Sequence, residues 1–174
     1  MKMPCPRVIW LSVMLAMAQS TLAADAVPAC AKDPGPKAAV TGYLTAMKEK
    51  RFEAAYNFVT ATMTDSASVK EWAGLQRKMF ELGGVTIGEI DVREAVVDRA
   101  KPNTCAPSAK VPNVLHAGDV MNNQGSAEFE VYTVLQTKGK WQIDSQETLV
   151  GNDAIQHWFP GEKIPDYKGT ADKP

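Results

Sequence analysis

The stretch AEFEVYTVLQ at residues 127–136 carries the clearest structural signal in this chain. One set of alternating positions is mostly apolar: Ala127, Phe129, Val131, Thr133 and Leu135. The other set is mostly polar: Glu128, Glu130, Tyr132 and Gln136. A period of two is typical of a β-strand with one buried face. We therefore predict an antiparallel strand here, with the apolar set toward the core.

Turn-forming residues stand on both sides of this strand. The segments NNQG at 122–125 and KGK at 138–140 have the composition of tight turns. A last strand is predicted from residue 141 to about residue 150, where apolar residues again alternate. Two strands joined by a short turn indicate a β-hairpin.

The region upstream has a weaker strand pattern. The apolar alternation changes phase at Gly88, between residues 85–87 and residues 90–92. A phase change at a glycine is typical of a β-bulge. Residues 100–112 contain Pro, Asn and Cys and are predicted to form a loop, followed by a strand at 114–121.

Residues 36–82 show the 3.6-residue period of amphipathic helices. Three helical segments begin at Pro36, Phe52 and Ser68. The third has a capping box, in which Ser68 and Glu71 each satisfy a free backbone N–H of the first turn. Gly83 and Gly84 follow its last apolar residue and are a stop signal. Helices followed by a run of antiparallel strands predict an α+β domain.

Three sequence segments resemble nuclear transport factor two-like proteins. KAAVTGYLTAM at 37–47 and RFEAAY at 51–56 are similar to the family's first helix pair, and GKWQID at 139–144 to its last hairpin. The resemblance covers about residues 36–148. It implies N-terminal helices packed in a strongly bent antiparallel β-sheet, which forms a cone with an apolar pocket. This cystatin-like superfamily includes isomerases, SnoaL-like cyclases, scaffolds and exported domains of unknown function, so the fold does not choose a function.

The N-terminus has the three-part pattern of a cleavable secretory signal peptide. Lys2 and Arg7 precede a mostly apolar stretch at residues 8–18, and small residues follow. Cleavage is expected after Ala23 or Ala24, and an uncleaved anchor is the alternative. No cysteine stands where a lipoprotein requires one. We therefore expect a soluble periplasmic or secreted protein with no stable membrane anchor after cleavage.

The predicted organisation has four parts. They are a signal peptide at 1–24, a lead-in at 25–35, the nuclear transport factor two-like domain at 36–150 and a C-terminal tail at 151–174. Within the tail, Trp158 and Phe159 are expected to pack on the body and cap the pocket, with a partner surface as the alternative. Disorder is expected from about Ile164.

Removal of the signal peptide takes Cys5 away and leaves Cys30 and Cys105 as a pair. Two remaining cysteines in an oxidising compartment usually form a disulfide. The long loop that they close predicts a stabilisation of roughly 4 kcal/mol. A metal or redox role is the alternative, but no CxxC or neighbouring His favours it.

Charge and motifs exclude several classes of function. The formal net charge is −1 and there is no basic stripe, so nucleic acid is not an expected partner. The chain has two histidines, with no Cys or carboxylate at ligand spacing, so no metal site is predicted. There is no phosphate-binding glycine loop and no nucleophile motif, so no cofactor and no catalytic residue is assigned.

The resemblance directs the search for a site to the inside of the cone. Family members similar to ketosteroid isomerase or the SnoaL-like cyclases use a carboxylate or His there, held with Tyr or another acid. The pocket candidates in this chain are Tyr43, Tyr56, Trp72, Phe80 and His116. Packing in the core is the alternative for the tyrosines, Trp72 and Phe80.

Three functions remain open. The first is an exported, non-enzymatic binding or accessory domain, whose apolar pocket or sheet surface takes a small apolar ligand or a protein partner. The second is a small isomerase-like or cyclase-like enzyme acting on an apolar substrate. The third is a homodimeric envelope scaffold, which a flat exposed sheet with Tyr132 and Val134 pointing outward would favour.

Overall fold

The computed structural model describes residues 35–98 and 108–163. The helical elements are α1 (Gly35–Lys48), α2 (Phe52–Ala55) with the 3-10 turn Tyr56–Phe58, α3 (Val69–Gly83) and, at the end, α4 (Asn152–Trp158). The strands are β1 (Thr86–Val92), β2 (Val96–Val97), β3 (Ser108–Gly118), β4 (Ser126–Thr137) and β5 (Lys140–Thr148). The predicted α+β class is confirmed. No helix in the described ranges is long and apolar enough to cross a membrane.

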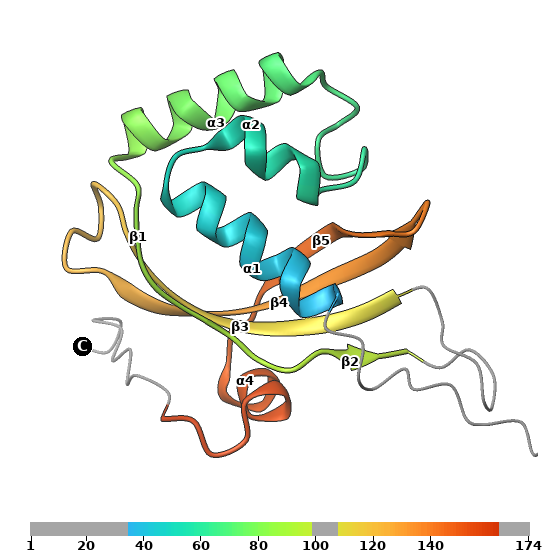
Figure 1. The fold of residues 1–174 in the computed structure, drawn as a ribbon. Coiled ribbons are helices and arrows are strands. Elements are labelled where there is room, and N and C mark those ends of the chain that lie inside the picture. The colour runs from blue at the N-terminus through green and yellow to red at the C-terminus, as the bar shows by residue number, and fades with distance from the viewer. Residues whose placement is uncertain (1–34, 99–107, 164–174) are drawn as a thin grey trace, which may run out of the picture.

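The strands form one antiparallel sheet that curves around α1 (Figure 1). The strand order is β1-β3-β4-β5, and β2 extends the sheet beside β3. The helices α1, α2 and α3 lie over one side, which we call the inner face, and α4 lies on the opposite, outer face (Figure 1). Helices packed on a bent antiparallel sheet are the arrangement that the sequence resemblance implies.

The local signals around α3 and β1 are confirmed. The hydroxyl of Ser68 accepts a hydrogen bond from Glu71 N, and the Glu71 carboxylate accepts one from Ser68 N at 3.0 Å. Gly84 ends the helix with a positive φ of 57°, which a residue without a Cβ adopts at little cost. The register of β1 against β3 shifts between Ile87 and Ile90, where the bulge is predicted at Gly88.

Strand β3 begins earlier than predicted, at Ser108, and contains Pro112. The backbone N–H and C=O of a residue in an antiparallel strand point to the same neighbouring strand. Pro112 O accepts from Arg93 N at 2.9 Å, so the missing N–H of Pro112 faces the link between β1 and β2. The proline therefore removes no hydrogen bond from the ladder between β3 and its neighbouring strands. Residues 108–112, predicted as loop, therefore belong to β3.

Strand β4 is buried on both faces, which corrects the prediction of a solvated polar side. Phe129 and Val131 pack on the outer face, as expected for the apolar set. Glu130, Tyr132 and Val134 lie on the inner face and are also buried. The alternation predicted the strand correctly, but the polar set lines the interior under α1.

Helix α4 closes the outer face over an apolar cluster formed with β3, β4 and the segment after β5. The buried members are Val114, Phe129, Val131, Leu149, Ile155 and Phe159. The rings of Phe129 and Phe159 meet edge to face, with centroids 5.2 Å apart. Phe159 and Trp158 therefore pack on the body as predicted, but the prediction that they cap the inner pocket is wrong.

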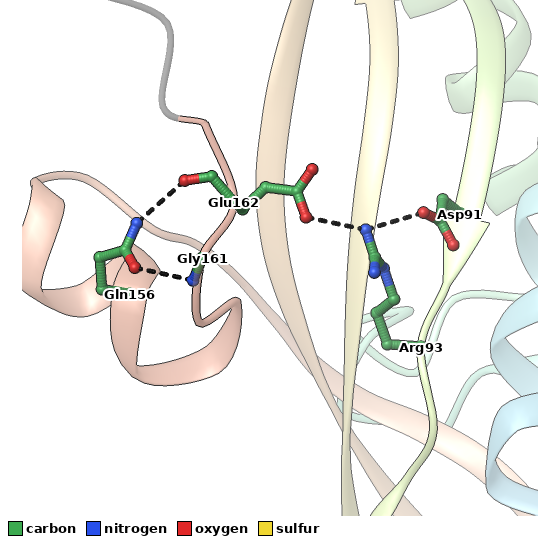
Figure 2. Close-up of polar contacts among 5 residues, drawn as sticks. All are labelled: Asp91, Arg93, Gln156, Gly161 and Glu162. Atoms are coloured by element: carbon green, nitrogen blue, oxygen red, sulfur yellow. Dashed lines mark hydrogen bonds and ion pairs between the residues drawn. The ribbon is translucent and has the colours of Figure 1, made fainter.

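Polar contacts also hold the segment after α4 (Figure 2). The guanidinium of Arg93, which follows β1, pairs with Asp91 at 2.9 Å and with Glu162 at 3.1 Å. Gln156 donates to Glu162 O and accepts from Gly161 N, which closes the turn after the helix. These contacts fix the chain as far as Glu162 against the edge of the sheet.

Candidate functional site

A cavity of about 370 Å³ lies between the inner face of the sheet, α1 and the end of α3. Its apolar wall consists of Leu44, Met47, Phe80, Val85, Ile87, Leu115 and Ala117. Its polar wall includes Tyr43, Asp119, Asn122, Ser126, Glu128, Glu130, Tyr132 and Gln146. The volume falls near the lower end of the range of small-molecule sites, roughly 300–1,000 Å³.

Glu130 is the polar centre of this cavity. Only 1% of the surface of Glu130 is exposed to solvent. One carboxylate oxygen, Oε2, accepts from Asn113 Nδ2 at 2.9 Å and from the Tyr132 hydroxyl at 2.8 Å. The other, Oε1, accepts from Gln146 Nε2 at 2.5 Å. A buried carboxylate is tolerated only with such partners.

The three donors come from three adjacent strands. Asn113 on β3 is the cross-strand neighbour of Glu130 on β4, and Gln146 on β5 is the neighbour of Tyr132. Tyr132 is two residues from Glu130, so its side chain projects from the same face of β4. The sheet register therefore builds this cluster directly.

Burial raises the pKa values of two acidic groups in this cavity. It raises the pKa of Glu130 above the ordinary 4.5, against the lowering effect of the hydrogen bonds, and the charge of Glu128 adds to the rise. Partial burial raises the pKa of Glu128, with a further contribution from the charge of Asp119. Asp119 itself accepts from the backbone N–H groups of Met121 and Asn122 in a turn at the cavity mouth. Raised pKa values in a cavity are typical of functional sites.

Two tyrosines stand against Glu130. Their rings meet edge to face, with centroids 6.3 Å apart and an interplanar angle of 64°. Burial and the charge of Glu130 raise the pKa of Tyr43 to about 12, and raise that of Tyr132 well above 10.0. The hydroxyl of Tyr132 donates to Glu130, whereas the hydroxyl of Tyr43 has no hydrogen-bond partner within the described ranges.

Of the five candidates from the sequence, the structure brings two to the cavity. Tyr43 and Phe80 line it. Tyr56 and Trp72 pack edge to face with centroids 5.8 Å apart, and the Tyr56 hydroxyl donates to Ala67 O, so both have a packing role elsewhere. His116 is exposed and lines a depression on the other side of β3, outside this cavity.

The sequence did not reveal the acidic residues of the site, because Glu128 and Glu130 belong to the set expected to face solvent. A signal was present in the same set. Tyr132 and Val134 alternate in phase with Glu130, and two bulky side chains on one face of a strand indicate that this face is covered. Regular alternation places Val134 on the inner face with Glu130 and Tyr132, and the register shift at this point skips Asp144 on β5 and brings Ile143 opposite Val134.

Several predictions fall outside the described residues. These are the signal peptide at 1–24, nearly all of the lead-in, the pair Cys30 and Cys105, and the tail beyond residue 163. Within residues 35–98 and 108–163, no group of three or more His, Cys, Asp or Glu side chains is arranged to hold a metal ion.

Comparison with known proteins finds similarity of fold. No family model and no curated protein matches the chain. A ketosteroid isomerase-like protein from Erwinia carotovora atroseptica is 17% identical to this chain, with a TM-score of 0.49. The match covers 69% of this chain and 99% of the Erwinia chain. A Nostoc punctiforme domain of unknown function with a cystatin-like fold is 15% identical, with a TM-score of 0.48. That match covers 71% of this chain and 79% of the Nostoc chain.

A third similar structure is a hypothetical protein with a ketosteroid isomerase-like fold from Catenulispora acidiphila, solved in complex with trimethylamine. It is 13% identical, covers 68% of this chain and 89% of its own, and has a TM-score of 0.42. Identities this low concern the fold alone. With α1–α3 on the inner face of a curved antiparallel sheet, the chain has the arrangement that its sequence resemblance to nuclear transport factor two-like proteins implies.

Proposed function

We propose that this protein is an exported small-molecule-binding domain whose ligand occupies the inner-face cavity. The observation that carries the proposal is Glu130, a carboxylate that is 1% exposed, lines the cavity and is held by donors from three strands. Burying a charge opposes folding, and a packed apolar core would avoid the cost. A carboxylate retained in a cavity is therefore best explained by a ligand that uses it.

The two walls of the cavity define the ligand's shape. The apolar body would lie against Leu44, Met47 and Phe80, and the polar end would reach Glu128 and Glu130. Export is part of the proposal because of the signal-peptide pattern at residues 1–24. The protein would meet its ligand outside the cytoplasm.

The test is a ligand screen on the mature protein, followed through two variants. Native mass spectrometry would identify any ligand carried through purification, and a thermal-shift screen of small metabolites would extend the search. Glu130→Gln is expected to weaken each hit by at least about tenfold, because it removes the charge at the polar end. Glu147→Gln is the matched control, since Glu147 is exposed on the outer face opposite Val131.

Hits that bind wild type, Glu130→Gln and Glu147→Gln equally would contradict the proposal. So would a screen in which no compound stabilises the wild-type protein. Retained stability of Glu130→Gln, measured by denaturant unfolding, would show that a loss of binding is not a loss of folding.

A proton-transfer enzyme is the second candidate, and the raised pKa values of Glu128 and Glu130 favour it. A carboxylate whose pKa is displaced toward neutrality is suited to act as a general base or acid. The test is hydrogen–deuterium exchange at the acidic C–H bonds of a panel of apolar ketones, followed by NMR. Exchange that requires Glu130 would establish catalysis, and exchange at the buffer rate would exclude it for this panel.

The homodimeric scaffold receives no support from the inner face. Tyr132 and Val134, whose outward orientation would favour such a dimer, are buried under α1. The proposed function therefore concerns the cavity and not a sheet-mediated dimer.

A further inference from the structure

We propose that the ligand of this cavity is an organic cation, an alkylated ammonium ion with a small apolar body and a hydrogen-bonding group. This inference rests on the proposed function and names the class of ligand. It follows from the charges of the lining, from one unpartnered hydroxyl and from the placement of aromatic rings.

The lining carries negative charge without compensation. Asp119, Glu128 and Glu130 all line the cavity, and none of its described lining residues is Lys, Arg or His. Glu130 and Asp119 already accept hydrogen bonds from the protein. The carboxylate of Glu128 accepts none within the described residues and lies half-buried, so it is available to pair with a ligand. A cavity of this charge favours a cation and opposes an anion.

Tyr43 is an independent indication that a polar ligand belongs here. The residue is 7% exposed and lines the cavity, and the charge of Glu130 acts on its hydroxyl. No hydrogen-bond partner for that hydroxyl exists in the described part of the chain. The hydroxyl oxygen is not among the fully buried atoms of the described residues that lack a partner, so it is accessible from the cavity. A ligand N–H or O–H group would satisfy it.

Aromatic rings complete the environment of the cation. Tyr43 and Tyr132 meet edge to face, and Phe80 lines the same cavity. The faces of such rings attract ammonium groups, which are less strongly hydrated when alkylated. A hard metal ion is not expected, because the described residues form no metal-binding group of three or more ligands. A carboxylate, an unpartnered hydroxyl and aromatic side chains line the same cavity, and together they suit an alkylated ammonium ion.

Three probes of nearly equal shape separate the effect of ligand charge on binding from the effect of ligand size. Choline carries a quaternary nitrogen, 3,3-dimethylbutan-1-ol replaces that nitrogen with carbon, and 3,3-dimethylbutanoate carries a negative charge. Each is titrated into the isotope-labelled mature protein at millimolar concentration, and binding is followed by chemical shifts of cavity residues. Choline is expected to bind at least about tenfold more tightly than the alcohol, and the carboxylate not at all.

Variants assign the selectivity to the cavity. Glu128→Gln is expected to reduce the ratio of choline to alcohol affinity by about tenfold, because it removes the available carboxylate. Tyr43→Phe should weaken both choline and the alcohol, since each carries a hydroxyl. Glu147→Gln should change neither affinity, because its side chain lies on the outer face.

Equal affinities for choline and the alcohol would overturn the cation proposal while leaving a binding domain in place. So would a selectivity for choline that persists unchanged in Glu128→Gln. If none of the three probes shifts cavity residues, the cation proposal is overturned, and the metabolite screen with Glu130→Gln then decides the binding function separately.

Discussion

The two faces of β4 differ although their residues alternate along one strand. On the outer face, Phe129 and Val131 meet α4 in an entirely apolar cluster. On the inner face, Glu130 and Tyr132 are equally buried, yet they border a cavity and share a hydrogen-bond network. Burial alone therefore does not distinguish the two faces. The polar groups and the unfilled volume of the inner face distinguish them. We therefore assign stability to the outer face and ligand binding to the inner face.

The largest effect on stability is expected from Phe129→Ala. The ring is 4% exposed and packs against Phe159, so its removal leaves a cavity in the outer cluster. We expect the free energy of unfolding to fall by about 3–5 kcal/mol in urea denaturation. Ligand affinity of the folded variant should be unchanged. A loss under about 1 kcal/mol would show that α4 is not packed there as described.

A smaller loss is expected from Tyr132→Phe on the inner face. The ring is kept, but Glu130 loses one of the three hydrogen bonds to its carboxylate. Hydrogen bonds to charged groups contribute about 1.5–3 kcal/mol, which is the expected decrease in the free energy of unfolding. A double-mutant cycle with Glu130→Gln measures the coupling. Strict additivity would contradict a shared network.

The stability of the inner face should also depend on pH. The pKa of Glu130 is raised in the folded protein above the ordinary 4.5, so the folded state holds this proton more tightly than the unfolded chain. The resulting stabilisation is fully present below the unfolded pKa and is lost as the pH rises through the folded pKa. Glu128 shifts in the same direction.

The measurement is denaturant unfolding of wild type and Glu130→Gln over a range of pH. The wild-type free energy of unfolding, relative to the variant, is expected to decrease as the pH rises from acid toward neutral. The remaining carboxylates are common to both proteins and largely cancel. A relative stability that increases with pH would mean that the hydrogen bonds outweigh burial at Glu130.

The smallest effect is expected from Glu162→Gln near α4. The Arg93–Glu162 pair is more than a third exposed on both sides, at 40% and 38%. Exposed pairs contribute about 0.2–1 kcal/mol and are screened by salt. We expect a loss of this size at low ionic strength, which disappears in molar salt. A larger, salt-independent loss would show that the pair, rather than the apolar cluster, holds the segment.

The sequence predicted features that depend on local chemistry. Ser68 with Glu71 marks the start of α3, Gly84 marks its end, and Gly88 marks the bulge in β1. Each of these signals acts within a few residues, through a cap, a positive φ or a change of strand phase. The α+β class followed from such patterns, and the cone architecture from the family resemblance alone.

What the sequence did not predict depends on contacts between distant segments. Alternation in β4 separates two sets of side chains, but it does not say that α4 covers one set and α1 the other. Glu130 is buried because Asn113 and Gln146 reach it from neighbouring strands. Pro112 fits in β3 because its missing N–H faces the gap between β1 and β2. Strand pairing had to be known before either residue could be placed.

The most direct test of the central claim is the position of a bound ligand relative to the two faces of β4. Intermolecular NOEs would be measured between a hit from the screen and the aromatic rings of the labelled protein. We predict NOEs to Tyr43 and Tyr132, on the inner face, and none to Phe129 or Phe159. NOEs to the outer rings, with none to Tyr43 or Tyr132, would contradict the assignment of binding to the inner face.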